Sequence, residues 1–293
     1  WTGQMYGDFS RVDVSRIQQY ASLDSLGVAL NRGQGALRAW ADVSKGKITS
    51  ALADVALQDV DVRLGAKLEP LGFESLTGRL GASQHAQGFD FSTEGLQFRA
   101  RDGLQWPGGN LALVHTSETR SASQNTTLKA DRLDLAALAQ IASRLPLDSG
   151  VQAMLASFAP QGLVEILDAR WQGPLDAPSA FAAKGRVAGL SVAALPAPVP
   201  APGGRAAGAV EALPGRPGLS GATVDFNLTQ EGGQASVKMV KGALDLPGIF
   251  EESKLMLDQL STEAKWKVAG QKIDLQLRDL QFANADAQGQ AQV

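Results

Sequence analysis

Gly242–Phe282 reads GALDLPGIFEESKLMLDQLSTEAKWKVAGQKIDLQLRDLQF, and apolar and polar residues alternate over most of this stretch. The clearest alternation is in two triplets on either side of the turn signal VAGQK: Ala264, Trp266 and Val268, then Ile273, Leu275 and Leu277. Successive side chains of a β-strand point to opposite faces, so period two gathers the apolar side chains on one face. The stretch predicts antiparallel strands with one apolar and one polar face, and it carries no obvious catalytic group.

The same alternation recurs along the rest of the chain. It is carried by these sets: Val55 and Leu57, then Val60, Val62 and Leu64; Val224, Phe226 and Leu228; and Ala235, Val237 and Met239. The glycines of QEGGQ, residues 230–234, separate two such strands as a hairpin turn does. Because short links favour antiparallel neighbours, we predict a mainly β chain of roughly a dozen antiparallel strands.

Helical spacing replaces this pattern near residues 133–158. A first helix is predicted between a cap at Asp134 and a stop at Pro146, and a second runs from Ser149 to Phe158. We expect the pair to form a short helical hairpin packed on the sheet. A further helical turn or two is predicted behind Asp13.

Proline, glycine and alanine dominate residues 195–218, which favours a flexible loop. We therefore divide the chain into a β segment over residues 1–194, the loop at 195–218, and a continuation of the β segment over 219–293. The chain opens at Trp1 and stops within an alternating pattern, so we interpret it as a piece of a longer protein. No apolar run reaches the ~18 to 20 residues of a membrane-spanning helix.

Composition excludes several classes of function. The formal net charge is -3, with acidic and basic residues interspersed, whereas a nucleic-acid-binding protein needs a clustered basic face. We predict no nucleic-acid partner. The chain has no cysteine, which excludes disulfides, thiol nucleophiles and cysteine-ligated metals.

Catalytic and metal-binding patterns are missing as well. His85 and His115 are the two histidines, which are too few for a metal site with several histidine ligands, and neither has the partner that a catalytic triad requires. We interpret His115 as a structural residue of a strand. Gly33 and Gly35 start a glycine motif, but Arg38 stands where a dinucleotide-binding loop needs its third glycine. We predict no metal, no cofactor and no enzymatic activity.

An apolar sheet face must be covered by something, and the few predicted helices do not suffice. One solution is a second sheet, as in a structural or adhesive β-sandwich of the cell envelope. The other is a curved sheet whose apolar face forms a trough filled by lipid chains. A hydrolase is a third class, but the sequence offers no nucleophile with a plausible base.

Five stretches carry a resemblance that favours the trough. They are GQGALRAWADVSKGKITSALADVALQDVDVRL, LTGRLGASQHAQGFDFSTEGLQFRARDGLQWP, LKADRLDLAALAQIASRLPL, PGLSGATVDFNLTQEGGQASVKMVKGALDLPGIFEES and LQFANADAQGQ. Together they resemble the periplasmic part of the YhdP proteins of the AsmA-like family, and LDLPGIFEES followed by NADAQG is the most specific portion. The chain departs from the family pattern by lacking the anchoring helix and by containing residues 195–218, which look like an insertion.

The resemblance implies a fragment of a bridge-like lipid transport protein of Gram-negative bacteria. Such a protein has an inner-membrane anchor and an elongated, curved antiparallel sheet. Its open apolar groove carries phospholipid acyl chains across the periplasm to the outer membrane. The partners implied are phospholipids, and both membranes through parts outside this fragment. The residues that we expect to line the groove are Val224, Phe226, Leu228, Val237, Met239, Leu255, Leu257, Trp266, Val268, Ile273, Leu275 and Leu277. For each, packing in an ordinary core is the alternative.

Overall fold

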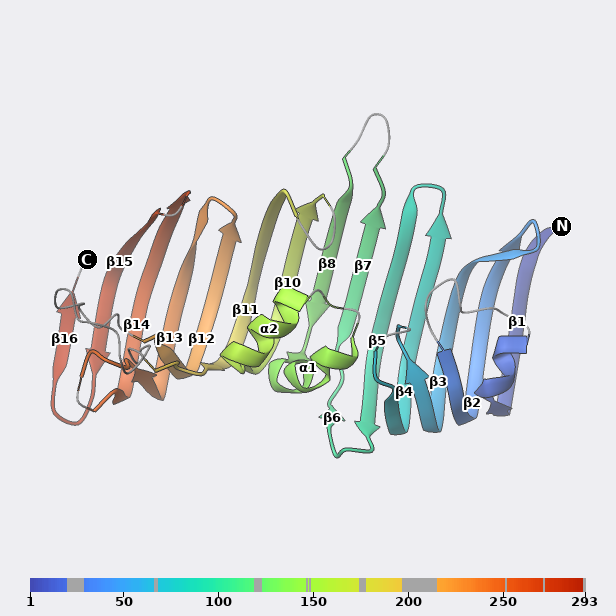
Figure 1. Cartoon of the computed structure of the whole chain (residues 1–293), viewed down its shortest axis with the longest axis horizontal. Coiled ribbons are helices and arrows are strands. Elements are labelled where there is room, and N and C mark those ends of the chain that lie inside the picture. The colour runs from blue at the N-terminus through green and yellow to red at the C-terminus, as the bar shows by residue number, and fades with distance from the viewer. Residues whose placement is uncertain are drawn as a thin grey trace, which may run out of the picture. The chain divides into compact units, whose positions relative to one another are not determined.

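A computed structural model describes residues 1–19, 29–65, 68–118, 123–145, 147, 149–173, 178–196, 215–250, 252–270 and 272–291. In these ranges sixteen strands form one open antiparallel sheet, with β1 and β16 at the two ends of the strand order (Figure 1). Almost every strand lies beside its neighbour in sequence, as short hairpin links require. The prediction of a mainly β fold is confirmed. The β-sandwich alternative is wrong, because the described strands make one sheet and not two.

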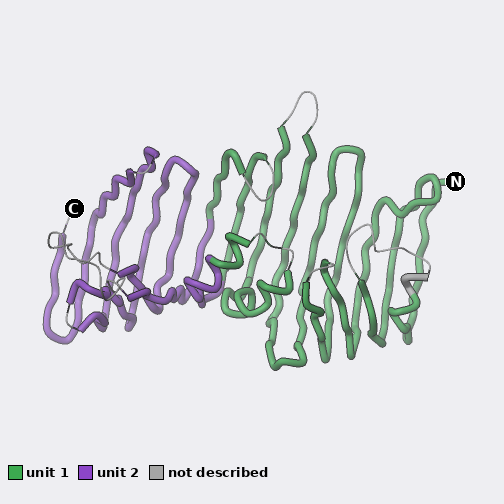
Figure 2. The backbone as a smooth tube through the Cα atoms, in the orientation of Figure 1, with its two compact units in different colours: residues 1–153, 164–184 green, residues 154–163, 185–293 purple. Residues whose placement is uncertain are grey.

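The chain divides into two compact units (Figure 2). Unit 1 comprises residues 1–153 and 164–184, and unit 2 comprises residues 154–163 and 185–293. Strands β10 (Gln161–Gln172) and β11 (Ala180–Val192) have residues in both. The division that we predicted at residues 195–218 stays a prediction, and residues 197–214 lie outside the described part of the chain. On the two sides of that segment, Leu195 forms an antiparallel bridge with Arg216.

Unit 1 is built mainly from strands that follow one another along the chain. They are β1 (Thr2–Asp13), β2 (Ala29–Ser44), β3 (Lys47–Arg63), β4 (Leu71–His85), β5 (Gly88–Ala100), β6 (Gln105–Trp106), β7 (Asn110–Thr116), β8 (Asn125–Asp131) and β9 (Leu133–Asp134). The short strands β6 and β9 pair with β5 and β10. The other strands follow chain order, and most of their positions have a defined cross-strand partner.

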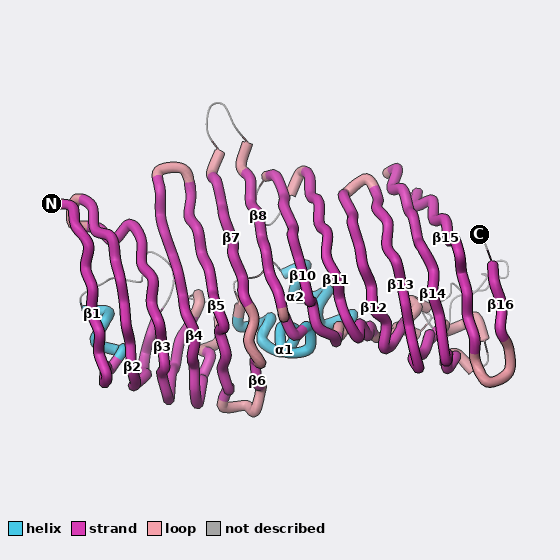
Figure 3. The backbone as a smooth tube through the Cα atoms, turned by 180° about the vertical axis from the view of Figure 1, so that it is seen from behind, coloured by secondary structure: helices cyan, strands magenta, loops and turns pink. Residues whose placement is uncertain are grey.

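Helices cover one end of one face of the unit 1 sheet (Figures 1 and 3). The 3-10 helix η1 (Val14–Gln19) contributes Val14 to a core with Val60, Leu71 and Phe73 of the strands. Helix α1 (Leu135–Ile141), continued by η3 (Ala142–Arg144), adds Ile141 to the same core. This core occupies only part of the face. No helix within the described ranges is long and apolar enough to cross a membrane.

The predicted helical hairpin is confirmed in position. Asp134 caps α1 by accepting a hydrogen bond from the backbone nitrogen of Ala137 at 2.9 Å. Helix α2 covers Ser149–Phe158, as expected, but it has no buried residue. Leu155 and Phe158 of α2 are half-buried, so this helix packs more loosely than α1 does. Arg216 holds its end by donating to the backbone oxygen of Ser157 at 2.6 Å.

Unit 2 continues the meander. Its strands are β12 (Gly218–Thr229), β13 (Gly232–Asp245), β14 (Lys254–Ala269), β15 (Lys272–Ala283) and β16 (Gln288–Ala291), together with part of β11. Ala222, Met239 and Leu257 form a small core on one face. The remaining apolar residues of this face are partly or largely exposed.

Single residues in left-handed conformation reset the alternation within long strands. Asp59, Lys241 and Asp279 have φ values of 50°, 52° and 50° and are exposed. Leu57 precedes Asp59 and Val60 follows it, and both are buried. In a regular strand, residues three positions apart would point to opposite faces. Such an interruption keeps the apolar residues before and after it on the same face of the sheet.

Candidate functional site

The face that carries η1 and α1 is apolar far beyond the helices. Residues that are cross-strand partners lie on the same face of a sheet. One row of partners crosses β1, β2, β3, β4, β5, β7, β8 and β10, and its members are Met5, Ala41, Ala51, Ala82, Phe91, Leu113, Leu128 and Ala169. Every residue of this row, the apolar row of unit 1, is hydrophobic.

The neighbouring row on the same face has almost the same character. It comprises Gly7, Ala39, Ala53, Leu80, Thr93, Leu111, Ala130 and Leu167. Thr93 is its one polar member. The two rows together give an apolar strip that runs across eight strands and contains no charged group.

Polar residues begin at the margin of this strip. Phe89, His115, Thr126 and Trp171 are successive cross-strand partners there. His115 is buried, with its Nδ1 atom 2.8 Å from the Thr126 hydroxyl and its Nε2 atom 3.4 Å from the side chain of Gln124. The ring also lies 5.0 Å from that of Phe89. These contacts agree with a structural role for His115.

In unit 2, the register gathers the predicted lining residues on one face. Two of the rows are Phe226, Ala235, Ala264 and Leu277, and Leu228, Gly233, Trp266 and Leu275. The other predicted residues of these strands pair as Val224 with Val237, Met239 with Leu260, and Val268 with Ile273. Leu255 and Leu257 pair with Leu244 and Gly242. Whether these residues line a groove stays a prediction.

The environments of the predicted residues differ. Met239 and Leu257 are 2% and 6% exposed, because they pack against each other and Ala222. Ile273 and Leu275 are 66% and 56% exposed. One part of this face is therefore a packed core, and another part consists of apolar side chains exposed to solvent. The exposed side chains are the ones that a ligand could contact.

The opposite face of unit 1 is polar and ordered by charge. Asp8, Arg38, Asp54, Arg79 and Glu94 are successive partners across five strands and alternate in sign. The Nε atoms of Arg38 and Arg79 lie 3.1 Å from Asp8 and 2.6 Å from Asp54. Opposite charges on neighbouring strands favour this register, although such exposed pairs contribute little to stability.

These contacts predict a pH dependence. The hydrogen bond from Arg79 lowers the pKa of Asp54, and hydrogen bonds from Ser50 and Gln4 lower the pKa of Asp42. Lowered carboxyl pKa values stabilise the fold above the unfolded value of about 3.9, and this stability is lost as pH falls through the folded values. We expect the melting temperature to fall below about pH 4 and to depend less on pH in Asp54→Asn. An unchanged pH profile in that variant would contradict this assignment.

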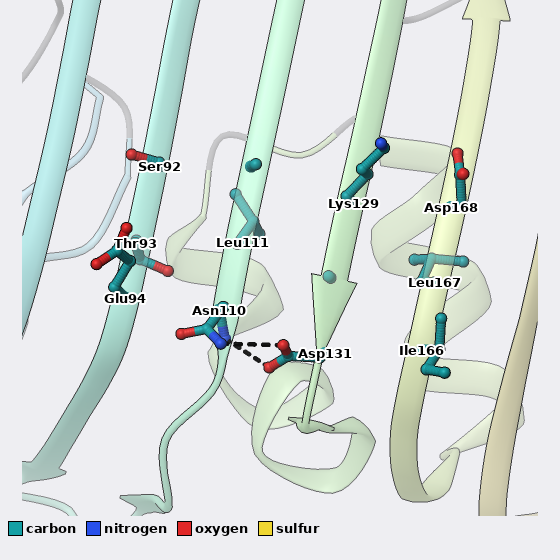
Figure 4. Close-up of a pocket in the computed structure, with 12 residues that line it drawn as sticks. Ser92, Thr93, Glu94, Asn110, Leu111, Lys129, Asp131, Ile166, Leu167 and Asp168 are labelled. Carbon is teal, nitrogen blue, oxygen red and sulfur yellow. Dashed lines mark hydrogen bonds between the residues drawn. The ribbon is translucent and has the colours of Figure 1, made fainter.

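A hollow of about 620 Å³ lies in unit 1 (Figure 4). Its walls include Glu94, Asn110, Lys129, Asp131 and Asp168. Burial opposes ionisation of Asp131, but the hydrogen bonds from the side chain and backbone of Asn110 and the contact with Arg132 together outweigh it, so the pKa of Asp131 is lowered. The lining also includes Thr93, Leu111, Ala130 and Leu167, which belong to the second row of the apolar strip. The hollow therefore has both polar and apolar walls and shares residues with the strip.

The sequence singled out lining residues in unit 2 alone and missed the strip of unit 1. Alanine supplies much of that strip, for example Ala41, Ala51 and Ala82, and alanine gives a weak alternation signal. The sequence does carry one signal for the strip of unit 1, because every second position of GALRAWADV and of ITSALADVAL is uncharged.

Comparison with known proteins supports one assignment. No curated protein and no solved structure matches the chain. A family model described as YhdP protein matches residues 1–293, which is the whole chain. The family resemblance read from the sequence is confirmed: this chain belongs to the YhdP protein family.

Proposed function

We propose that the chain is a segment of a lipid transport protein that shields phospholipid acyl chains in a hydrophobic groove between the inner and outer membranes. The observation that carries the proposal is the apolar row of unit 1, which crosses eight strands without a polar residue. A row of this kind is what a hydrocarbon chain requires of its surroundings.

The energetics favour acyl chains as the ligand. Each methylene that moves from water to an apolar wall gains about 0.8 kcal/mol, and no catalytic group is needed. Ile273 and Leu275 offer such a wall at exposed positions of unit 2. The head groups of the lipids remain in water at the open side of the groove, so binding selects the chain and not the head group.

Membership of the family supports a proposed location and proposed partners. We infer a periplasmic position, as part of an inner-membrane-anchored protein of a Gram-negative bacterium, with both membranes reached through other parts of the protein. The chain itself acts without enzymatic activity in this proposal. Among the described residues, no group of three or more histidine, aspartate or glutamate side chains is placed to hold a metal ion.

Mass spectrometry of organic extracts tests the proposal. The chain is purified from bacterial envelopes without detergent exchange, extracted with organic solvent, and compared with a soluble protein of the same envelope fraction. We expect phospholipids to be recovered in stoichiometric amounts from the chain alone. Recovery no higher than that of the comparison protein would contradict acyl-chain binding.

A further inference from the structure

The polar face of unit 1 carries one apolar row. Tyr6, Trp40 and Leu52 are cross-strand partners on β1, β2 and β3, and the row continues through Gly81 to Ser92. By register these residues lie opposite the apolar strip, because their neighbours Met5, Ala41 and Ala51 belong to the strip. The row therefore has no part in the proposed lipid groove.

The three apolar side chains of this row are open to solvent. Tyr6 is 60% exposed, and Trp40 and Leu52 are each 36% exposed. The rings of Tyr6 and Trp40 have their centroids 5.4 Å apart with an angle of 43° between their planes. They form a shallow aromatic surface, which we call the aromatic platform (Tyr6, Trp40 and Leu52). Burial in a core does not account for these residues.

Hydrogen-bonding rows flank the aromatic platform on both sides. On one side, Asp42 accepts hydrogen bonds from Gln4 at 3.0 Å and from Ser50 at 2.6 Å. On the other side, Asp8 accepts from Arg38 at 3.1 Å, and Asp54 follows in the same row. Each flanking row is two residues away along the strands, or about 6.6 Å.

This arrangement matches the chemistry of a sugar ring. A pyranose has an apolar face of C–H groups, which stacks on aromatic rings, and hydroxyls at its rim, which exchange hydrogen bonds with polar side chains. Carboxylates accept several hydrogen bonds each and a guanidinium has five donors, so Asp42, Asp8 and Arg38 retain capacity beyond their mutual contacts. The aromatic platform and its flanking rows supply both kinds of contact.

Charge and size narrow the ligand further. Arg38 and Arg79 balance Asp8 and Asp54, which leaves Asp42 as the uncompensated charge beside the aromatic platform. The negative charge beside the aromatic platform disfavours polyanions such as nucleic acids or sulfated polymers. A stable protein interface buries roughly 800 Å² on each partner, far more than three side chains provide. A chain of neutral sugars fits both the charge and the size of the aromatic platform.

We propose that the aromatic platform binds the neutral pyranose rings of a polysaccharide, with the rings stacked on Trp40 and Tyr6 and the hydroxyls reaching Asp42 and Arg38. The site goes beyond lipid transport and uses the opposite face of the sheet. Each proposal can therefore fail without the other.

Titration of the whole chain with N-acetylglucosamine trimer and with cellotriose, followed by the indole N–H signals in NMR, tests this site. We expect the Trp40 signal to shift while those of the other tryptophans stay in place. Trp40→Ala should weaken binding about tenfold or more, whereas Trp40→Phe and Tyr6→Phe, which keep a ring, should stay within about threefold. Phe250→Ala removes an exposed aromatic residue of unit 2 and should leave the affinity unchanged.

Heparin provides the anionic comparison. The proposal is overturned if neither neutral sugar shifts the Trp40 signal, if Trp40→Ala binds them as tightly as the unmodified chain, or if heparin binds the same residues more tightly. Thermal melting of each variant shows that the sheet is intact, and the response of the Trp40 signal in the unmodified chain decides the matter if Trp40→Ala does not fold.

Discussion

Leu128→Asp should reduce the phospholipid recovered with the chain by about tenfold or more. Leu128 stands in the apolar row of unit 1, between Leu113 and Ala169 on the neighbouring strands. A carboxylate at this position would face hydrocarbon without a partner. Burying an unpaired charge costs several kcal/mol, and each 1.4 kcal/mol lowers the affinity for lipid tenfold. Lipid phosphorus per mole of protein is the quantity to measure.

Thr127→Asp is the matched control for this experiment. Thr127 is adjacent on the same strand but belongs to the polar face, where Arg170 is its cross-strand partner. The new carboxylate therefore meets a cation and water, and lipid recovery should stay unchanged. Equal losses in the two variants would show that strand β8 lacks two distinct faces.

Gly232→Ala should destabilise the chain by about 2 kcal/mol or more. Gly232 has φ +139°, and a methyl group there would overlap the backbone oxygen of Trp266 on the neighbouring strand. The β13–β14 ladder would have to separate at this point, since backbone yields less readily than a flexible side chain. Urea unfolding followed by circular dichroism measures the effect.

Gly3→Ala serves as the comparison. The nearest atoms that a methyl group would meet there belong to the Trp1 ring at 3.8 Å, an ordinary contact. Its free energy of unfolding should change by less than about 0.5 kcal/mol. A stable Gly232→Ala variant would mean that the hairpin between β12 and β13 tolerates a different register.

Period-two alternation was sufficient to predict the faces of the strands in unit 2. The alternation predicts that Phe226, Trp266 and Leu275 share a face, and the cross-strand register puts them on one face. Burial of one face specifies register strongly, because a slip of one residue would turn every apolar side chain to water. The start of α1 is equally predictable from the sequence, because Asp134 is a typical capping residue and accepts a hydrogen bond from the backbone of the helix.

Other features depend on contacts between distant residues. Lys241 and Asp279 reset the alternation through a left-handed backbone, which a lysine or an aspartate does not reveal in sequence. The aromatic platform needs Tyr6 of β1 to lie beside Trp40 of β2, a register that the separate strands do not disclose. The exposure of Val151 and Met154 on α2 also depends on tertiary contacts, because their spacing in sequence resembles that of a packed helix.

Site-specific photo-crosslinking in cells tests the central claim, that the apolar face of each unit carries lipid, most directly. The crosslinking residue is placed at Phe91, Leu128, Phe226 and Leu275 on the apolar faces, and at Thr127, Asp225 and Gln276 on the polar faces. We predict phospholipid adducts at all four apolar positions and none at the three polar ones. Adducts at the polar positions, or no adducts at the apolar ones, would contradict a lipid-carrying function for this chain.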